Sequence, residues 1–406
     1  MPDNRMIKYQ YEFYKNYLLN GIMSFWENRT KDSECGGYFT CFDKNGNLTD
    51  SKKYVWFQGR QLWMFSALYN TFKDKKWLEL AQHGRDFLVK HAYAGNGRWN
   101  YQLDRYGKLE VGTSSIYSDL FVISGLAELA IAEGTRRDEQ LIIDTYKSIE
   151  RNVLDLDFKD IYHNVWNAKH KKHGLYMINL IVLPIVSKVI GEEKTRSLID
   201  HCLENILYIF AKDEHETLLE AVGRNGEYVD DEEGHITYPG HTFESCWAAI
   251  HEGRRRQDQT IIDRALQIYD WAFKWGHDEQ YGGIFSYRDI TSETPKQFDW
   301  NKETNMSWDD KNFWVNAEAL AISAVAFAER QTEDYFARFK NISSWTYNHF
   351  FDQDNGEWYA ELYRDGSIKL SDKGTIWKAA YHVPRGIFIT MQEFKNLLEN
   401  NEKYTG

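Results

Sequence analysis

Apolar residues recur at the 3.6-residue spacing of an amphipathic helix along most of the chain. Only five prolines interrupt the 406 residues, so long helices can continue unbroken. The spacing predicts twelve helices, arranged as six hairpins. Their expected bounds are residues 4–28, 57–72, 75–91, 117–134, 137–154, 173–191, 193–212, 241–256, 258–275, 312–331, 333–350 and 380–399.

Between these helical pairs, apolar and polar residues alternate with a period of two, which is typical of short strands. Five segments alternate in this way, and four of them run into a polar turn with Gly or Asn. A weaker sixth segment begins at Tyr162. The segments start at residues 36, 97, 162, 216, 282 and 356, and each interval leaves room for two helices.

Six helical hairpins that recur with a strand-turn-strand at each step predict an all-α fold, the (α/α)6 barrel. In this fold inner helices alternate with outer ones, and short β-hairpin loops at one end wall a pocket. An open solenoid of helix pairs is the alternative. We favour closure because such repeats rarely carry a β-hairpin at every step, and we expect residues 1–406 to form a single domain.

Charge and composition exclude several classes of partner. Acidic residues outnumber basic ones by 61 to 49 and no Lys/Arg-rich run offsets this, so we expect no nucleic-acid partner. The longest apolar run, residues 175–190, contains Pro184 and Lys188 and is expected to be a buried helix rather than a membrane span. Four cysteines without metal-ligand spacing and an N-terminus without an apolar stretch favour a cytoplasmic protein with reduced thiols.

One cation stands out on an otherwise apolar helix face. Arg60 follows Trp56 by one turn, and a guanidinium is seldom buried without a partner. It is expected either to form a core ion pair, for example with Glu318, or to stabilise an oxygen that becomes negative during a reaction. Glu318 lies in an inner-helix pattern, where it would orient a histidine, bind a hydroxyl or pair with an arginine.

Two histidines stand near expected helix starts in different hairpins. His241 follows the Pro239-Gly240 loop end, and His382 begins the last helix. Each alone fits a structural role, but two bases on opposite walls of one pocket would let a proton leave one face of a carbon and return to the other. Aromatic residues make up 16% of the chain, and their flat faces suit sugar rings, although most will fill the helical core.

Other polar motifs point to no further chemistry. His163, His170 and His173 lie among lysines and are expected to form a solvated basic loop. No phosphate-binding glycine motif and no serine nucleophile motif occurs, and we expect no metal site.

Around Arg60, His241, Glu318 and His382 the sequence resembles the N-acylglucosamine 2-epimerase family, which includes cellobiose and mannose 2-epimerases. The strings that carry the resemblance are KYVWFQGRQLWMFSALYN, TYPGHTFESCW, HDEQYGGIFSY, WDDKNFWVNAEA and AAYHVPRGIF. The resemblance implies an (α/α)6 barrel and an isomerase that inverts C2 of an aldose after ring opening. By motif, His241 and His382 would remove the C2 proton and return one, with an enediolate as the intermediate. Arg60 would hold the negative oxygen of the enediolate, and Glu318 would support a histidine. Expected substrate contacts are Trp56, Tyr117, Glu220, Glu244, Trp314, Asn316 and Trp377.

Two departures from the family pattern bear on substrate and regulation. Members that act on N-acylglucosamine usually carry a histidine where this chain has Asn316. Members stimulated by a nucleotide carry a glycine-rich stretch of which DKGTIWKAA, residues 372–380, keeps only part. We therefore expect no cofactor, with ATP as a non-consumed effector as the alternative. The expected partner is a small sugar, and a homodimer is expected from the likeness alone.

Three functions remain open. A 2-epimerase, or the related aldose–ketose isomerase, needs His241 and His382 in one pocket. A glycoside or unsaturated-uronide hydrolase on the same barrel would instead use two carboxylates, about 6.5–9.5 Å apart if it inverts. Glu220, Glu244 and Glu318 are the candidates for that pair. A non-catalytic barrel would bind sugars without proton exchange.

Overall fold

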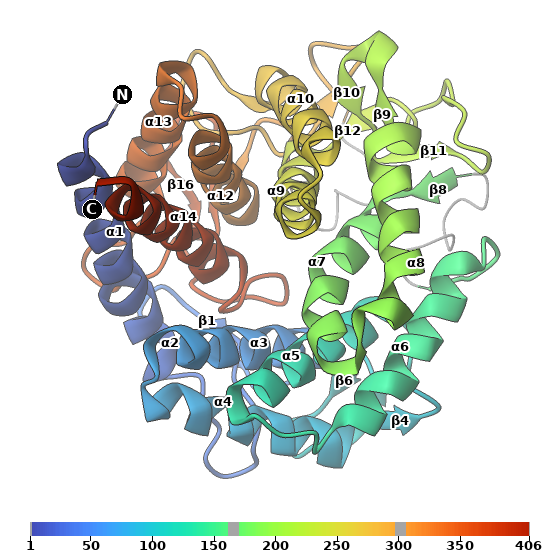
Figure 1. Cartoon of the computed structure of the whole chain (residues 1–406). Coiled ribbons are helices and arrows are strands. Elements are labelled where there is room, and N and C mark those ends of the chain that lie inside the picture. The colour runs from blue at the N-terminus through green and yellow to red at the C-terminus, as the bar shows by residue number, and fades with distance from the viewer. Residues whose placement is uncertain (1, 161–169, 297–305, 406) are drawn as a thin grey trace.

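The chain forms a closed ring of paired helices in the computed structural model, which describes residues 2–160, 170–296 and 306–405. Six inner helices line the ring and an outer helix packs against each of them (Figure 1). The inner helices are α3 (Val55–Phe72), α5 (Ile116–Glu133), α7 (His173–Ile190), α9 (Pro239–Arg256), α12 (Phe313–Arg330) and α14 (His382–Thr405). Their outer partners are α4 (Lys75–Phe87), α6 (Glu139–Leu154), α8 (Glu192–Glu204), α10 (Gln259–Gly276), α13 (Glu333–His349) and α1 (Asn4–Asn16). The predicted (α/α)6 barrel is confirmed.

The expected helix bounds are close to those observed. Every expected helix is present and begins within two residues of its expected start. Side chains that accept a backbone N–H in the first turn fix many of these starts. They belong to Asp3, Asp74, Ser115, Asp258, Asn312 and Thr332. Three outer helices continue into π-helical turns, namely α1 through η1 (Tyr17–Met23) to α2 (Ser24–Glu27), α4 through η2 (Leu88–Ala92) and α8 through η3 (Asn205–Phe210).

One of the six pairs joins the two ends of the helical series. Helix α14 packs on α1, so the first and last helices complete the ring, and the two chain ends lie side by side (Figure 1). Asn401 Nδ2 donates to Asn4 Oδ1 at 2.8 Å across this pair. The ring is closed, as the barrel requires and an open solenoid does not.

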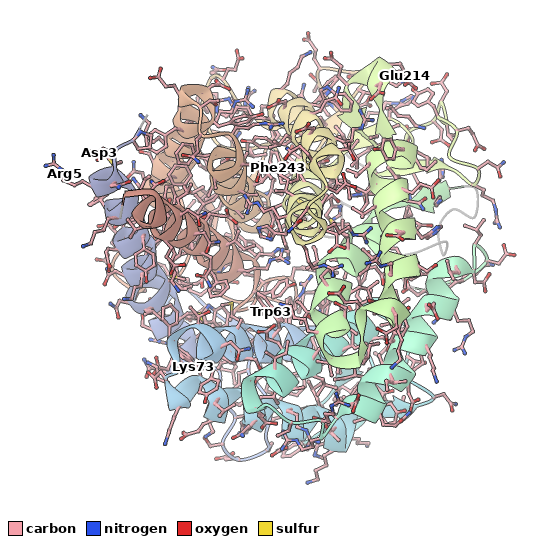
Figure 2. All side chains as sticks on the ribbon, viewed as in Figure 1. Asp3, Arg5, Trp63, Lys73, Glu214 and Phe243 are labelled. Carbon is pink, nitrogen blue, oxygen red and sulfur yellow. The ribbon has the colours of Figure 1, made fainter. Side chains whose placement is uncertain are left out.

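Glycines allow the inner helices to approach one another closely. An added Cβ at Gly59 of α3 would lie 2.5 Å from the carbonyl carbon of Phe121 of α5. One at Gly386 of α14 would lie 2.5 Å from the carbonyl oxygen of Ala317 of α12. Side chains fill the middle of the ring (Figure 2), and the inner helices are apolar on most sides.

Helix α7 is the one described helix that is long and apolar enough to cross a membrane by length and composition alone. Of its apolar window, 78% is buried inside the barrel. This is the burial expected for the run 175–190, and it is explained by the inner position of the helix. All four cysteines are free.

Short antiparallel strands lie between the helical pairs. Three of the expected hairpins form as such, and these are β1–β2 (Cys41–Phe42, Leu48–Asp50), β6–β7 (Gln102–Leu103, Leu109–Val111) and β15–β16 (Glu361–Leu362, Ile368–Leu370). The expected hairpins after residues 216 and 282 are wrong in their pairing. Instead, β11 (Ala221–Gly223) pairs with β8 (His170–Lys172), and β13 (Arg288–Asp289) pairs with β12 (Ile236–Thr237). Most of the weaker segment from Tyr162 lies outside the described residues.

The remaining strands are equally short. They are β3 (Lys53–Tyr54), β4 (Tyr93–Gly95), β5 (Arg98–Trp99), β9 (Ala211–Lys212), β10 (Thr217–Leu218) and β14 (Lys311–Asn312). Strands β3 and β14 lead directly into the inner helices α3 and α12, so the strand-bearing loops and the inner-helix starts lie at the same end of the barrel.

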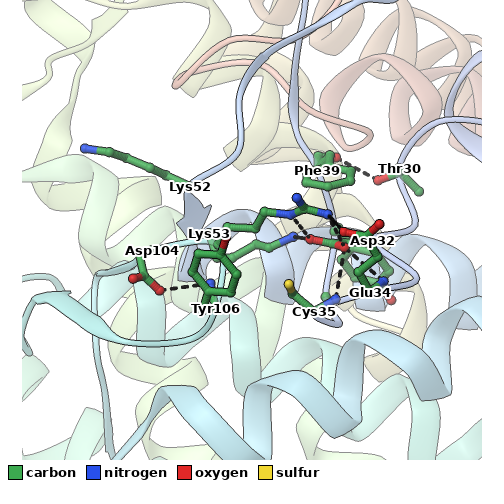
Figure 3. A network of polar contacts seen from close by, with 12 residues as sticks. Thr30, Asp32, Glu34, Cys35, Phe39, Lys52, Lys53, Asp104 and Tyr106 are labelled. Carbon is green, nitrogen blue, oxygen red and sulfur yellow. Dashed lines mark hydrogen bonds and ion pairs between the residues drawn. The ribbon is translucent and has the colours of Figure 1, made fainter.

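Ion pairs with the buried Asp32 connect three of these loops. Lys53 Nζ donates to Asp32 at 3.0 Å, and neither side chain is exposed (Figure 3). Arg105, from the β6–β7 hairpin, donates to the same carboxylate. The arrangement recurs as Lys311–Asp278 at 2.9 Å and Lys373–Asp352 at 3.0 Å. These pairs hold the loop end of the barrel, where the inner helices begin.

Replacing Asp32 by asparagine is expected to lower the free energy of unfolding by about 3–5 kcal/mol, because Lys53 would remain buried without its counter-charge. Urea denaturation followed by circular dichroism measures the change. The control is Glu139→Gln, since its partner Arg136 is 81% exposed and such pairs contribute about 1 kcal/mol or less. Equal losses in the two variants would contradict the prediction.

Candidate active site

The first two turns of all six inner helices supply the polar and aromatic side chains of one cluster. The members are Arg60 of α3, Tyr117 of α5, His173 of α7, His241 of α9, Trp314 and Glu318 of α12, and His382 of α14. Helix N-termini carry a partial positive charge and unpaired N–H groups, so their convergence favours a negatively charged ligand or intermediate. These residues lie together because all six inner helices begin at the same end of the barrel.

His241 is held by a carboxylate from the loop between β10 and β11. Its Nδ1 lies 2.9 Å from Glu220 Oε2, and its side chain remains 28% exposed. His173 contacts the same group, with Nδ1 3.7 Å from Glu220 Oε2 and Nε2 2.9 Å from Ser245 Oγ. Proline at the start of α9 suits the first helical position, where no N–H is needed, and fixes the backbone just before His241.

His382 is held by a second, fully buried group of charges. Its Nδ1 lies 2.8 Å from Glu318 Oε1. Arg385, one turn later on α14, donates to Glu318 at 2.6 Å and to Glu244. The indole N–H of Trp247 donates to the other oxygen of Glu318 at 2.9 Å. Each oxygen of the buried Glu318 carboxylate thus has at least one fixed partner.

The two histidines face a common indole. The ring centroid of Trp314 lies 5.0 Å from that of His241 and 5.7 Å from that of His382. A ring that binds a carboxylate through Nδ1 keeps Nε2 for a ligand. The arrangement therefore offers two separately held imidazoles beside one aromatic face.

Arg60 lies in an aromatic cage and not in an ion pair. Its guanidinium carbon lies 3.9 Å from the ring centroid of Phe121, 4.8 Å from that of Tyr381 and 5.2 Å from that of Trp56. Among the described residues it forms no salt bridge, and its buried Nε has no hydrogen-bond partner. The expected pairing with Glu318 is wrong, because Arg385 occupies that carboxylate.

The surroundings lower the pKa of Arg60 and of His382 and raise that of His241. Burial lowers the pKa of Arg60 to about 10, but the guanidinium stays charged at neutral pH. Burial would lower the pKa of His241, yet the Glu220 carboxylate outweighs it and the pKa is raised. Burial holds the pKa of His382 well below its usual value, and the charges of Arg60, Arg385 and His241 act in the same direction. The two imidazoles therefore differ in basicity.

Other expected contacts lie at different depths. Tyr117 is half-buried, and an added Cβ at Gly174 would lie 2.9 Å from its hydroxyl and 3.8 Å from Glu220 Oε1. Trp377 is 44% exposed, and its ring packs edge-on against the nearly buried Trp56 at 5.5 Å. These two tryptophans extend the cluster toward the surface, where an aromatic face can meet a sugar ring.

Two of the expected substrate contacts belong to the walls of the site. Asn316 has no exposed surface, accepts the N–H of Ile284 at 2.9 Å and donates to the carbonyl of Asn312. Glu244 is 1% exposed and binds Arg385. In this structure Asn316 supports the loop and Glu244 supports the His382 group, and a direct contact of either side chain with substrate stays a prediction.

Sequence reasoning missed His173, Arg385 and Trp247. The expectation of a solvated loop is wrong for His170, which is 1% exposed, and for His173, which is fully buried at the first position of α7. Its signal was the apolar run that follows directly, since a histidine at an inner-helix start faces the same end as His241. Arg385 lies one turn after His382, the spacing at which side chains share a helix face.

Two groups of ligand-type atoms are compact enough to enclose an ion. One comprises His173, Glu220 and His241, and the other comprises Glu244, Glu318 and His382, each with ligand atoms within 4.8 Å of one another. In the second group Arg385 forms ion pairs with both carboxylates. In the first, His241 and His173 share Glu220. In each group a carboxylate thus holds a histidine through Nδ1.

Known carbohydrate epimerases resemble the chain along most of its length. The chain is 28% identical to mouse (Mus musculus) N-acylglucosamine 2-epimerase over 399 residues, which cover 95% of this chain and 92% of that protein. It is 24% identical to the cellobiose 2-epimerase of Dictyoglomus turgidum, over 90% of this chain and 94% of that protein.

Solved structures show the same fold. A sugar epimerase from a ruminal bacterium superposes with a TM-score of 0.81 at 20% identity, covering 94% of this chain and 98% of that chain. A family 76 glycoside hydrolase from Bacteroides thetaiotaomicron is more distant, with a TM-score of 0.63 at 10% identity over 96% of this chain and 78% of that chain. Residues 37–385 match the N-acylglucosamine 2-epimerase (GlcNAc 2-epimerase) family. The chain therefore belongs to this family and is a carbohydrate 2-epimerase, an isomerase.

Proposed function

We propose that this epimerase interconverts N-acetylglucosamine and N-acetylmannosamine, or the C2 epimers of a closely related aldose, through two-histidine proton transfer. The observation that carries the proposal is the placement of His241 and His382 against Trp314, each with its own carboxylate at Nδ1. Two independently held bases can serve the two faces of one carbon, whereas a single base cannot invert it without moving.

The proposed reaction begins with the open-chain aldehyde. One histidine Nε2 removes the proton from C2, and the electron pair moves to the C1 oxygen. The resulting enolate, or enediolate when C2 carries a hydroxyl, is planar at C2. The second histidine Nε2 then delivers a proton to the opposite face, and the C1 carbonyl re-forms. No redox step or cofactor is needed for this balance, and we propose that none is used.

Stabilisation of the anionic intermediate is the energetic problem, because a C2 proton is a weak acid. Arg60 carries a fixed charge with an unpartnered Nε, caged by aromatic rings that exclude water. One preorganised donor of this kind contributes about 3 kcal/mol in transition-state stabilisation. The six inner-helix N-termini add partial positive charge at the same end.

The N-acetyl substrate is supported by the relatives named N-acylglucosamine 2-epimerase, which are 27–28% identical to this chain, against 24–25% for those named cellobiose 2-epimerase. Asn316 favours the second candidate, an unacetylated aldose or disaccharide, because it replaces the usual histidine of the N-acyl branch. Cytoplasmic location, homodimer formation and weak or absent ATP dependence are further parts of the proposal.

Proton NMR in deuterated water tests the proposal. We expect N-acetylmannosamine to lose its C2 proton signal and to yield N-acetylglucosamine that carries deuterium at C2. Mannose and cellobiose form the comparison arms, and ATP is added or omitted. Free monosaccharide from cellobiose would support a hydrolase, a ketose product would support aldose–ketose isomerisation, and unchanged spectra for all sugars would overturn the proposal.

Replacing Gly240 by alanine is expected to lower kcat/KM about 10²-fold, the order of loss that follows a 1 Å misplacement in an active site. An added Cβ at Gly240 would lie 2.4 Å from Cζ3 of Trp314, so the indole between the two histidines must move. Steady-state kinetics measure the effect. Gly112→Ala is the control, because a Cβ there meets nothing within 4 Å. Equal kinetics for the two variants would contradict the prediction.

A further inference from the structure

The carboxylates that hold the two catalytic histidines have different counter-charges. Arg385 binds both Glu244 and Glu318, and its Nη2 also lies 3.3 Å from His382 Nδ1. Its Nη1 donates to the hydroxyl of Tyr381 at 2.8 Å, which fixes the guanidinium plane. Arg385 is 1% exposed, so its charge acts at close range without screening by solvent.

No guanidinium binds Glu220 in the part of the chain that the structure describes. Its contacts there are His241 at 2.9 Å and His173 at 3.7 Å. His173 is fully buried, and burial lowers its pKa, so it is neutral and leaves the charge of Glu220 to His241. A carboxylate without another cation favours a protonated imidazole beside it.

Resting on the proposed two-histidine reaction, we propose that Arg385 is a positioning residue that makes the two histidines unequal. By forming ion pairs with Glu244 and Glu318, it opposes their negative charge and keeps His382 unprotonated in the resting enzyme, while Glu220 keeps His241 protonated. The free enzyme is therefore set to accept the C2 proton at His382 and to deliver one from His241.

The charged groups that face each ring agree with this inequality. His382 meets Glu318 from α12, Glu244 and His241 from α9, Arg60 from α3 and Arg385 on its own helix. The two carboxylates are thus opposed by two guanidinium groups. His241 meets Glu220 directly, with Glu244 and Glu318 adding negative potential. Burial and the two guanidinium groups lower the pKa of His382, and Glu220 raises that of His241.

The proposal has a consequence for the proton balance of turnover. When the C2 proton moves to His382 Nε2 and the proton of His241 Nε2 moves to the opposite face, the enzyme is left with the proton on His382. His382 must then lose this proton to solvent and His241 must regain one before the resting form returns. The epimer whose C2 proton faces His382 is accepted by the resting form, and the other epimer requires the reversed form.

NMR titration of the whole protein labelled with ¹⁵N-histidine tests the order of protonation directly. Signals are assigned with His241→Gln and His382→Gln. We expect His241 to titrate at higher pH than His382 in the wild-type chain. This measurement needs no substrate and no Arg385 variant. The reverse order in the wild-type protein would overturn the proposal.

Substitution at Arg385 tests the cause. In Arg385→Gln the titration midpoint of His382 is expected to rise by about 1–3 units, because Glu318 and Glu244 lose their counter-charge. In Arg385→Lys, which retains a charge, the titration midpoint of His382 should lie closer to the wild-type value than in Arg385→Gln. The matched control is Arg254→Gln on α9, which removes a guanidinium from Glu393 and Glu329 about 20 Å along the helix from His241. An unchanged His382 midpoint in folded Arg385→Gln would overturn the proposal.

The pH dependence of kcat/KM separates this role from a purely structural one. The acid limb reports the base that must be free of a proton, so it should move to higher pH in Arg385→Gln and stay in place in Arg254→Gln. A lower rate with an unmoved limb would reduce Arg385 to a packing residue. If no sugar is epimerised by the wild-type protein, the proposed function fails, while the NMR titration still decides the role of Arg385.

Discussion

Replacing His382 or His241 by glutamine is expected to lower the rate of epimerisation by about 10⁴-fold, the upper end of what a positioned acid or base contributes. Glutamine approximates the size of imidazole but accepts no proton. Both variants should keep the wild-type fold, because the carboxylates near His382 retain Arg385 as a partner and Glu220 retains His173 beside it. Coupled steady-state assays measure the rate, and circular dichroism verifies folding.

The two variants should differ in hydrogen exchange. A chain that keeps only His241 can still exchange the C2 proton of the epimer whose proton faces His241, without forming the other epimer. A chain that keeps only His382 should exchange the opposite epimer. NMR in deuterated water with each pure epimer reads this crossed pattern. Exchange of both epimers by one variant, or turnover near the wild-type rate, would remove the substituted histidine from the mechanism.

Replacing Arg60 by lysine is expected to lower kcat about 10²–10³-fold with a smaller change in KM, since the interaction is realised mainly in the transition state. An ammonium group lacks the planar fork of the guanidinium and cannot present two donors to one oxygen at fixed angles. Arg60→Met should be worse, because the charge is lost as well. Full kinetic analysis against N-acetylmannosamine measures both constants.

The control for Arg60 is Arg105→Lys, which alters a guanidinium in the loop ion pair with Asp32 outside the site. We expect its kinetics to stay near those of the wild type. Urea denaturation of all variants separates loss of catalysis from loss of fold. Normal kcat in Arg60→Lys would reject the oxyanion role.

The helical part of the fold could be predicted because it depends on the local spacing of apolar residues along the chain. Inner helices are apolar on most sides, outer helices are amphipathic, and both patterns repeat at 3.6 residues. Side-chain caps such as Asp258 and Asn312 mark their starts. The count of six pairs then predicts closure, because each inner helix must bury its remaining faces against two neighbours.

Pairing between distant segments could not be derived in the same way. Strand β11 pairs with β8 and β12 with β13, although each expected hairpin has a local turn. The choice depends on how the helices place the loops in space. A sequence pattern that extends over ten residues does not contain that information.

The site shows the same division. His241 and His382 could be proposed from their positions at helix starts and from the family likeness. The partners of the site could not, because Arg385 was free to bind any of three glutamates until the fold placed Glu244 and Glu318 beside it. The motif suggested a ligand contact for Asn316, and only the fold shows that its side chain accepts the backbone N–H of Ile284.

The pairing of α1 with α14 bears on how the enzyme matures. Of the described helices, α1 is synthesised first and α14 last. Their pair, which closes the ring, can therefore form only after all the other described helices have been synthesised. His382 sits at the first position of that late helix. The second of the two proposed bases therefore joins the folded barrel only with α14.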